Sequence, residues 1–169
     1  MPHVVFTGAH LGYDPRKVPL GGGAAVGIAL ARRWTETGPF PFLVLGSGDR
    51  PPLPGIPYRQ VAWDPRGEGH PAGLSVHQYA RLSREFERGV TQFLRDFARD
   101  VDPTEVCVLH NDIAEAGDFA EISSLGYRQV AIFHVDVVDY VAQIYLRGLL
   151  PARSLAPVWR GLERARLAP

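Results

Sequence analysis

The stretch Glu105-Val106-Cys107-Val108-Leu109-His110-Asn111-Asp112 is a short apolar run that ends in three polar side chains. Short apolar runs with polar ends are typical of buried strands in a parallel sheet. A second mainly apolar run, residues 129–133, shows the same pattern and is followed by His134-Val135-Asp136. The carboxyl ends of parallel strands meet at one edge of the sheet, where such sheets bind ligands, so we expect the two polar motifs to lie together there.

The rest of the chain alternates between strand-like and helix-like segments. The clearest helix covers residues 75–101, because apolar side chains recur there at helical spacing and Ser75 with Gln78 forms a capping box. Strands separated by helices predict right-handed crossovers around a parallel sheet. We therefore expect an α/β fold, a Rossmann-like parallel sheet flanked by helices, formed as one domain by residues 1–169. The expected strands cover residues 4–7, 40–45, 58–63, 105–109 and 129–133, the expected helices cover residues 24–34, 75–101, 114–125, 137–146 and 151–167, and residues 64–73 are expected to form a loop.

The charge balance argues against several classes of partner. The 169 residues include 18 Lys+Arg and 18 Asp+Glu, so the formal net charge is zero. A chain without a positive field has no general attraction for nucleic acid, and we expect no such partner. No apolar run reaches the roughly 18 residues of a membrane span, and the chain begins directly in a strand-like run, which favours a cytoplasmic location. Arginines interleaved with leucines over residues 147–166 leave a weak peripheral membrane contact open, beside simple packing on the sheet.

The glycines Gly21-Gly22-Gly23 precede the first expected helix. Glycines let a ligand approach the backbone, and the amide groups and dipole of a helix amino end favour a phosphate. The spacing is not that of a dinucleotide fingerprint, and residues 8–20 separate the glycines from the first strand, which argues against NAD. A purely structural glycine turn remains the alternative.

The His and Asp residues after the two strands are compatible with several kinds of chemistry. Imidazoles and carboxylates bind divalent metals, form hydrogen bonds with sugar hydroxyls, or act as acid and base. The spacing lacks the pattern of two histidines on one helix face that marks a strong zinc motif, so metal binding is the weaker interpretation. His10, in the first loop, is a weaker candidate for the same edge. A metal-dependent hydrolase would use His110, Asp112, His134 and Asp136.

Taken together, these motifs resemble the N-terminal domain of family 4 glycosyltransferases, the GT-B-fold group that includes starch and glycogen synthases and the group 1 glycosyltransferases. Three segments carry the resemblance, in the order of the family and over nearly the whole chain. Residues 19–34 resemble the family's glycine loop and first helix. Residues 105–112 resemble its strand ending in His-x-His-Asp, and residues 130–134 resemble its strand ending in Phe-x-x-His.

The resemblance implies one half of a two-domain enzyme that moves a sugar from a UDP-, ADP- or GDP-sugar to a hydroxyl of an acceptor glycan or small molecule. The nucleotide sugar is a substrate, and the resemblance implies neither a cofactor nor an essential metal. The glycines Gly21 to Gly23 would face the phosphates of the nucleotide. His134 would lie beside the transferred sugar and Asp112 would shape the acceptor side, so both are expected catalytic residues. The expected substrate-binding residues are Lys17, His110, Asn111 and Asp136.

The sequence departs from the family pattern in three places. Pro19 and Leu20 stand where the synthases have a lysine, and Asn111 stands where the second His of His-x-His-Asp would be. The donor-binding C-terminal domain has no counterpart in these residues, so we expect the chain to be inactive alone and to pair with such a domain. Two alternatives to a glycosyltransferase domain stay open: a non-catalytic binding module that retains the fold, and the metal-dependent hydrolase described above.

Overall fold

The computed structural model describes residues 3–14, 16, 21–61, 74–134, 151, 153–154, 157–158 and 160–161. Two expected segments lie wholly outside the described residues: the loop 64–73 and the helix 137–146. Most of the expected helix 151–167 lies outside them as well. The chain forms two compact units, Met1–Ile132 and Phe133–Pro169. The expectation of one domain over residues 1–169 stays a prediction.

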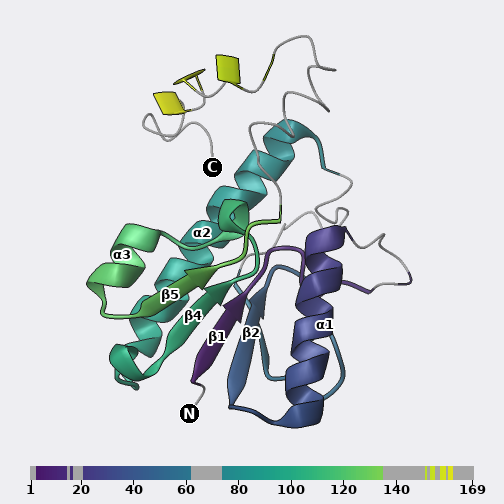
Figure 1. The fold of residues 1–169 in the computed structure, drawn as a ribbon, viewed down its shortest axis with the longest axis vertical. Helices are drawn as coiled ribbons and strands as arrows, with labels where there is room; N and C mark the ends of the chain where they lie inside the picture. The colour runs from purple at the N-terminus through teal and green to yellow at the C-terminus, as the bar shows by residue number, and fades with distance from the viewer. Residues whose placement is uncertain are drawn as a thin grey trace. The chain divides into compact units, whose positions relative to one another are not determined.

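The first unit is built on a five-stranded parallel sheet with the strand order β3-β2-β1-β4-β5 (Figure 1). Every pairing between neighbouring strands is parallel, and β1 is central: Val5 stands opposite Leu43 on one side and Val108 on the other. The parallel α/β fold expected from the sequence is therefore confirmed. The strands are β1 (Val4–Thr7), β2 (Phe42–Gly46), β3 (Tyr58–Gln60), β4 (Cys107–His110) and β5 (Arg128–Ala131).

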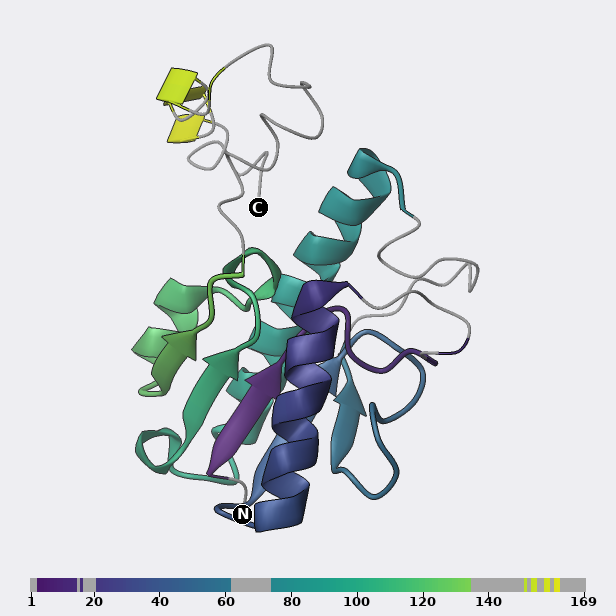
Figure 2. The same ribbon diagram turned by 45° about the vertical axis from the view of Figure 1, so that its right-hand side comes forward.

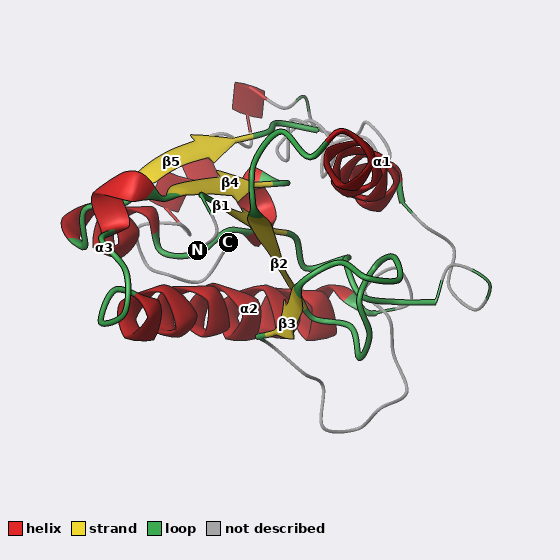
Figure 3. Ribbon diagram, turned by 90° about the horizontal axis from the view of Figure 1, so that it is seen from below, coloured by secondary structure: helices red, strands yellow, loops and turns green. Residues whose placement is uncertain are grey.

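Helices cover both faces of the sheet. Figure 3 shows α1 (Gly22–Thr37) on one face and α2 (Val76–Phe97) on the opposite face. The α2 helix begins at the expected capping box, in which the Gln78 Oε1 accepts from the Ser75 backbone amide at 2.9 Å. The described part of the first unit also contains the short helix α3 (Phe119–Ser124) and two single 3₁₀ turns, η2 (Pro103–Glu105) and η3 (Ile113–Glu115).

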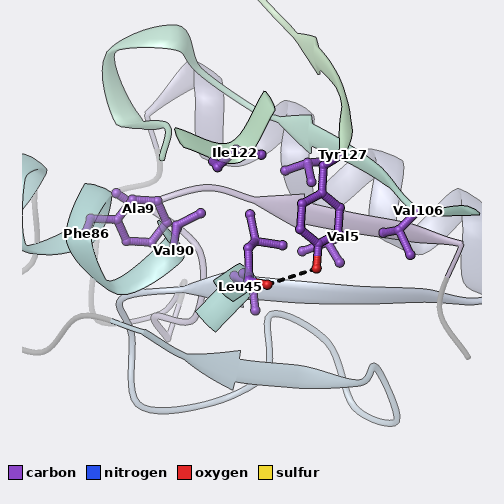
Figure 4. Close-up of a cluster of buried hydrophobic side chains, with 10 residues drawn as sticks. Val5, Ala9, Leu45, Phe86, Val90, Val106, Ile122 and Tyr127 are labelled. Atoms are coloured by element: carbon purple, nitrogen blue, oxygen red, sulfur yellow. Dashed lines mark hydrogen bonds between the residues drawn. The ribbon is translucent and has the colours of Figure 1, made fainter. Parts of the chain in front are cut away.

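Alternate residues of β1 supply two separate hydrophobic cores, because successive side chains of a strand point to opposite faces. Val5 packs with Phe86, Val90 and Ile122 beneath α2 and α3, and Figure 4 shows this cluster. The dashed line in Figure 4 is the hydrogen bond from the Tyr127 hydroxyl to the carbonyl of Leu94, 2.9 Å long. It satisfies a polar group that the core would otherwise bury unpaired.

The other core lies under α1. Phe6 and Ala31 are fully buried there, and the ring of Trp34 meets the ring of Phe6 edge-on with centroids 5.2 Å apart. Gly27 lies on the same helix face, where an added Cβ would be 3.1 Å from Leu11 and 3.2 Å from the Asn111 side chain. Small residues on this face therefore bring α1 close to the carboxyl edge of the sheet.

The structure corrects the expected helix over residues 114–125. The segment instead contains the η3 turn, a break, and the short helix α3. Asp118 accepts from the Glu121 amide at 3.0 Å, so Asp118 caps a new helix instead of continuing an old one. Gly117 permits close packing at the break, because a Cβ there would lie 2.5 Å from the Cδ1 of Ile122.

Helix α1 is longer than expected, since it begins at Gly22 and continues to Thr37 instead of covering residues 24–34. It ends where Gly38 adopts a left-handed conformation with φ of 55°. The α2 helix is shorter than the expected 75–101 and ends at Phe97. In the described part of the chain, no helix combines the length and the apolar character needed to cross a membrane.

Candidate functional site

The glycine loop and β4 meet at the carboxyl edge of the sheet. The Asn111 Nδ2 donates to the carbonyl oxygen of Gly23 at 2.9 Å, and the Asn111 backbone amide donates to the carbonyl of Thr7 at 2.8 Å. Asn111 therefore ties the first turn of α1 to the ends of both β1 and β4. Its side chain is buried, and its Oδ1 has no hydrogen-bond partner among the described residues. Two of the sequence-predicted site elements are thus in direct contact.

The amino end of α1 lies at the same edge as the carboxyl ends of the strands (Figure 2). Its N-cap residue is Gly21, no side chain among the described residues caps it, and its first turn contains no acidic residue. A Cβ added to Gly21 or Gly22 would meet no described atom within 4 Å. A helix end with free backbone amides and a positive dipole is a suitable binding place for an anion, in particular a phosphate.

His110 is buried within the sheet and is fully engaged in hydrogen bonds. The Gln129 Nε2 donates to the carbonyl of Phe119, which turns the Gln129 Oε1 toward the His110 Nε2 at 3.0 Å. Nε2–H therefore donates to Gln129, and Nδ1 accepts from the Thr7 hydroxyl, also at 3.0 Å. Burial lowers the pKa of His110 despite the bond to Gln129. Both nitrogens of this neutral ring are thus engaged within the sheet, and the substrate-binding role of His110 stays a prediction.

A second polar cluster at the same edge joins His10, Tyr79 and Glu115. The His10 Nε2 lies 2.6 Å from the Glu115 Oε1, and the Tyr79 hydroxyl donates to the same oxygen. The Glu115 side chain is only 5% exposed, whereas that of His10 is 26% exposed. Burial by itself lowers the pKa of His10, but the hydrogen bond and charge of Glu115, with the charge of Asp112, hold that pKa above its ordinary value.

Sequence reasoning missed two members of this cluster. Tyr79 lies within the expected helix 75–101, where it reads as one of the apolar side chains at helical spacing, and Glu115 lies within the expected helix 114–125. His10 was recognised only as a weaker candidate. Two features of the sequence could have pointed to the cluster: His10 follows β1 closely, and Glu115 follows β4 closely. That signal acquires meaning only once β1 and β4 are known to be neighbours.

The other predicted site residues are placed less directly. Asp112 follows β4 and contributes to the electrostatics of His10. His134 belongs to the second unit, so its proposed position beside a transferred sugar stays a prediction. Lys17 and Asp136 lie outside the described residues. Over residues 3–14, 21–61 and 74–134 and the other described positions, no group of three or more His, Cys, Asp or Glu side chains is arranged to hold a metal ion.

Comparisons of the chain with protein-family models, with curated proteins and with solved structures find no match. The geometry of the site offers two kinds of chemistry. One part, the open amino end of α1, can bind an anion. The other part, the His10–Glu115 pair, can form hydrogen bonds with a polar ligand and exchange a proton with it.

Proposed function

We propose that the chain is the acceptor-side domain of a glycosyltransferase, which moves a sugar from a nucleotide-sugar donor to an acceptor hydroxyl. One observation carries this proposal: the open amino end of α1 is tied by Asn111 to the carboxyl ends of β1 and β4. The sheet edge that binds ligands in α/β folds thus also carries an anion-binding helix end. A nucleoside diphosphate needs both features, the ligand-binding sheet edge and the helix end that attracts its phosphates.

Local amides have to supply the recognition of phosphate. The chain has a formal net charge of zero, so no long-range field attracts an anion to it. Lys17 would add a positive charge close to the phosphates in this proposal. A complete cleft requires a donor-binding partner domain, with which His134 and Asp112 would act on the sugar and the acceptor.

Isothermal titration calorimetry of the full chain with UDP, ADP and GDP tests the proposal. At least one nucleotide should bind, and Gly21→Asp should weaken its binding by at least about tenfold, because a carboxylate then competes with the phosphates for the helix end. Gly21→Asn is the matched control, because it adds a neutral cap of nearly the same size. Its loss of binding free energy should be less than half of the loss in Gly21→Asp.

Both variants should fold. Gly21 has φ of −68° and ψ of 167°, an extended conformation that any residue adopts, and there is room for a side chain. Aspartate is also a favoured N-cap residue, so the Gly21→Asp variant should unfold at a temperature no lower than that of the natural sequence. Lost affinity in a protein of unchanged stability would support the proposal. Absence of binding by all three nucleotides would exclude it.

A further inference from the structure

We propose that His10 is a binding residue for a hydroxyl group of the acceptor, with Glu115 and Tyr79 as the positioning residues that hold its ring. This inference rests on the proposed function and adds to it the place at which the acceptor is recognised. It depends on a cluster that brings together three parts of the chain: the loop after β1, the first turns of α2, and the η3 turn after β4.

The hydrogen bonds around Glu115 determine which nitrogen of His10 carries a proton. The Tyr79 hydroxyl and the His10 Nε2 both approach the Oε1 of Glu115, an atom that can only accept when the carboxyl group is ionised. Nε2 must therefore be the protonated nitrogen. In the neutral ring this leaves the lone pair on Nδ1, the same arrangement by which a carboxylate orients a histidine in other sites.

The described contacts of the His10 ring are made by Nε2. This nitrogen contacts both the Glu115 Oε1 and the Tyr79 hydroxyl, and about a quarter of the side chain is exposed. His110 provides an internal comparison, because its ring is fully buried and both its nitrogens form hydrogen bonds. Unlike His110, His10 is partly exposed, and its Nδ1 takes no part in the contacts with Glu115 and Tyr79.

Charge around His10 selects the class of ligand. The groups that face His10 are Glu115 from η3, Asp112 from the loop before it, and Tyr79 from α2. Two carboxylates repel a phosphate or a carboxylate ligand. A hydroxyl carries no charge, and it can either donate to a neutral Nδ1 or accept from a protonated one. It therefore suits a histidine that can be present in either protonation state, and Glu115 and Asp112 hold the pKa of this one above its ordinary value.

The buried carboxylate supports a functional explanation. Burying Glu115 removes it from water, and its bonds to Tyr79 and His10 offset that cost only in part unless the geometry is well matched. The same two bonds fix the plane and the tautomer of the His10 ring. A ring held in this way loses little conformational freedom when it binds a ligand, which favours recognition of a weakly binding neutral group.

Nitrogen NMR of the imidazole rings in the full chain tests the geometry without any enzymatic assay. We expect the neutral His10 ring to carry its proton on Nε2, with a pKa above the ordinary value. Glu115→Gln should lower that pKa and allow the tautomers to mix, whereas Glu115→Asp should restore part of the effect. A neutral ring protonated on Nδ1, or a His10 pKa that does not change in Glu115→Gln, would overturn the inference.

Binding is tested by titrating the same sample with glycerol, methyl α-D-glucopyranoside and maltose as hydroxyl probes, and with inorganic phosphate as the anion probe. At least one hydroxyl probe should shift the His10 Nδ1 resonance, and phosphate should not. His10→Gln places an amide nitrogen where Nε2 was, so Glu115 stays paired while the Nδ1 position is lost. This variant should bind the responding probe about three- to tenfold more weakly, the effect of one neutral hydrogen bond.

His77→Gln is the matched control, because His77 is exposed in the first turn of α2 and should leave probe binding unchanged. If no hydroxyl probe shifts His10, or if His10→Gln binds the responding probe as well as the natural sequence does, the inference is wrong. UDP titration in the same sample separates the two proposals. Shifts of the Gly22 and Gly23 amides report the nucleotide site, and the His10 resonance reports the acceptor site, so either proposal can fail while the other stands.

Discussion

Asn111→Asp replaces the buried donor nitrogen of Asn111 with an oxygen. The contact that joins α1 to the sheet edge then becomes repulsive, because an ionised carboxylate can only accept a hydrogen bond. In the natural protein the Asn111 Nδ2 donates to the carbonyl of Gly23 at 2.9 Å, and the residue is 3% exposed. An aspartate of the same shape places a carboxylate oxygen against that carbonyl. The introduced group can form the bond again only if it takes up a proton and donates, so we expect its pKa in the folded state to rise.

The size of the effect follows from the protonation. An unfolded aspartate has a pKa of about 3.9, and holding it protonated costs about 1.4 kcal/mol for each pH unit above that value. Protonation at pH 7 therefore costs roughly 4 kcal/mol, and at pH 4.5 it costs about 1 kcal/mol. Because the folded state retains a proton that the unfolded state releases, the variant loses stability as the pH rises above about 3.9.

Urea denaturation followed by circular dichroism at pH 4.5 and pH 7 measures this difference. The free energy of unfolding should fall short of the natural protein's by about 3–4 kcal/mol at pH 7 and by about 1 kcal/mol at pH 4.5. Asn111→Ala is the control, because it removes the same bond without adding a titratable group and should show a deficit that does not vary with pH. A deficit in Asn111→Asp that is equal at both pH values would refute the reasoning.

Two further predictions concern the packing and titration of buried groups. Gly89→Ala should destabilise the protein, because the added Cβ would lie 1.9 Å from the carbonyl oxygen of Val61. This is opposite to the usual effect in a helix, where alanine is favoured over glycine by about 1 kcal/mol. Thermal unfolding should show a lower midpoint for this variant and no such loss for Gly22→Ala, where the space is open. His110, whose pKa is lowered by burial, should reduce the stability of the fold as the pH falls below about 6.5, because the unfolded state then binds a proton that the folded state excludes. Denaturation of the natural protein and of His110→Gln between pH 7.5 and 5 should show this loss only in the former, and an equal pH dependence in both would contradict it.

Much of the fold was readable from local patterns. Four of the five strands were expected within two residues of each observed boundary, and the capping box of α2 was recognised from two side chains. The break in the expected helix 114–125 was missed, because the capping of α3 by Asp118 competes with simple helix propensity. The position of that break matters, since Glu115 lies in the η3 turn that it leaves behind.

The sequence by itself determined the elements and the polar groups at their ends: a glycine-rich start to α1, an Asn and an Asp after β4, and a His after β1. These signals are local, because they depend on side-chain periodicity and on the residues that bound each element. The sheet edge at which they gather could be predicted from the sequence, whereas their chemistry stayed open between several kinds.

Only the tertiary structure decided what each group does. Strand order places β1 beside β4, and this pairing brings Thr7 to His110 and the loop after β1 to Glu115. As a result His110 is enclosed with both ring nitrogens in hydrogen bonds, while His10, the weaker candidate by sequence, is partly exposed and contacts Glu115 through Nε2. The physical reason is that burial and hydrogen-bond partners are properties of neighbours in space, and strand neighbours are selected by packing across the whole sheet rather than by any pattern along one strand.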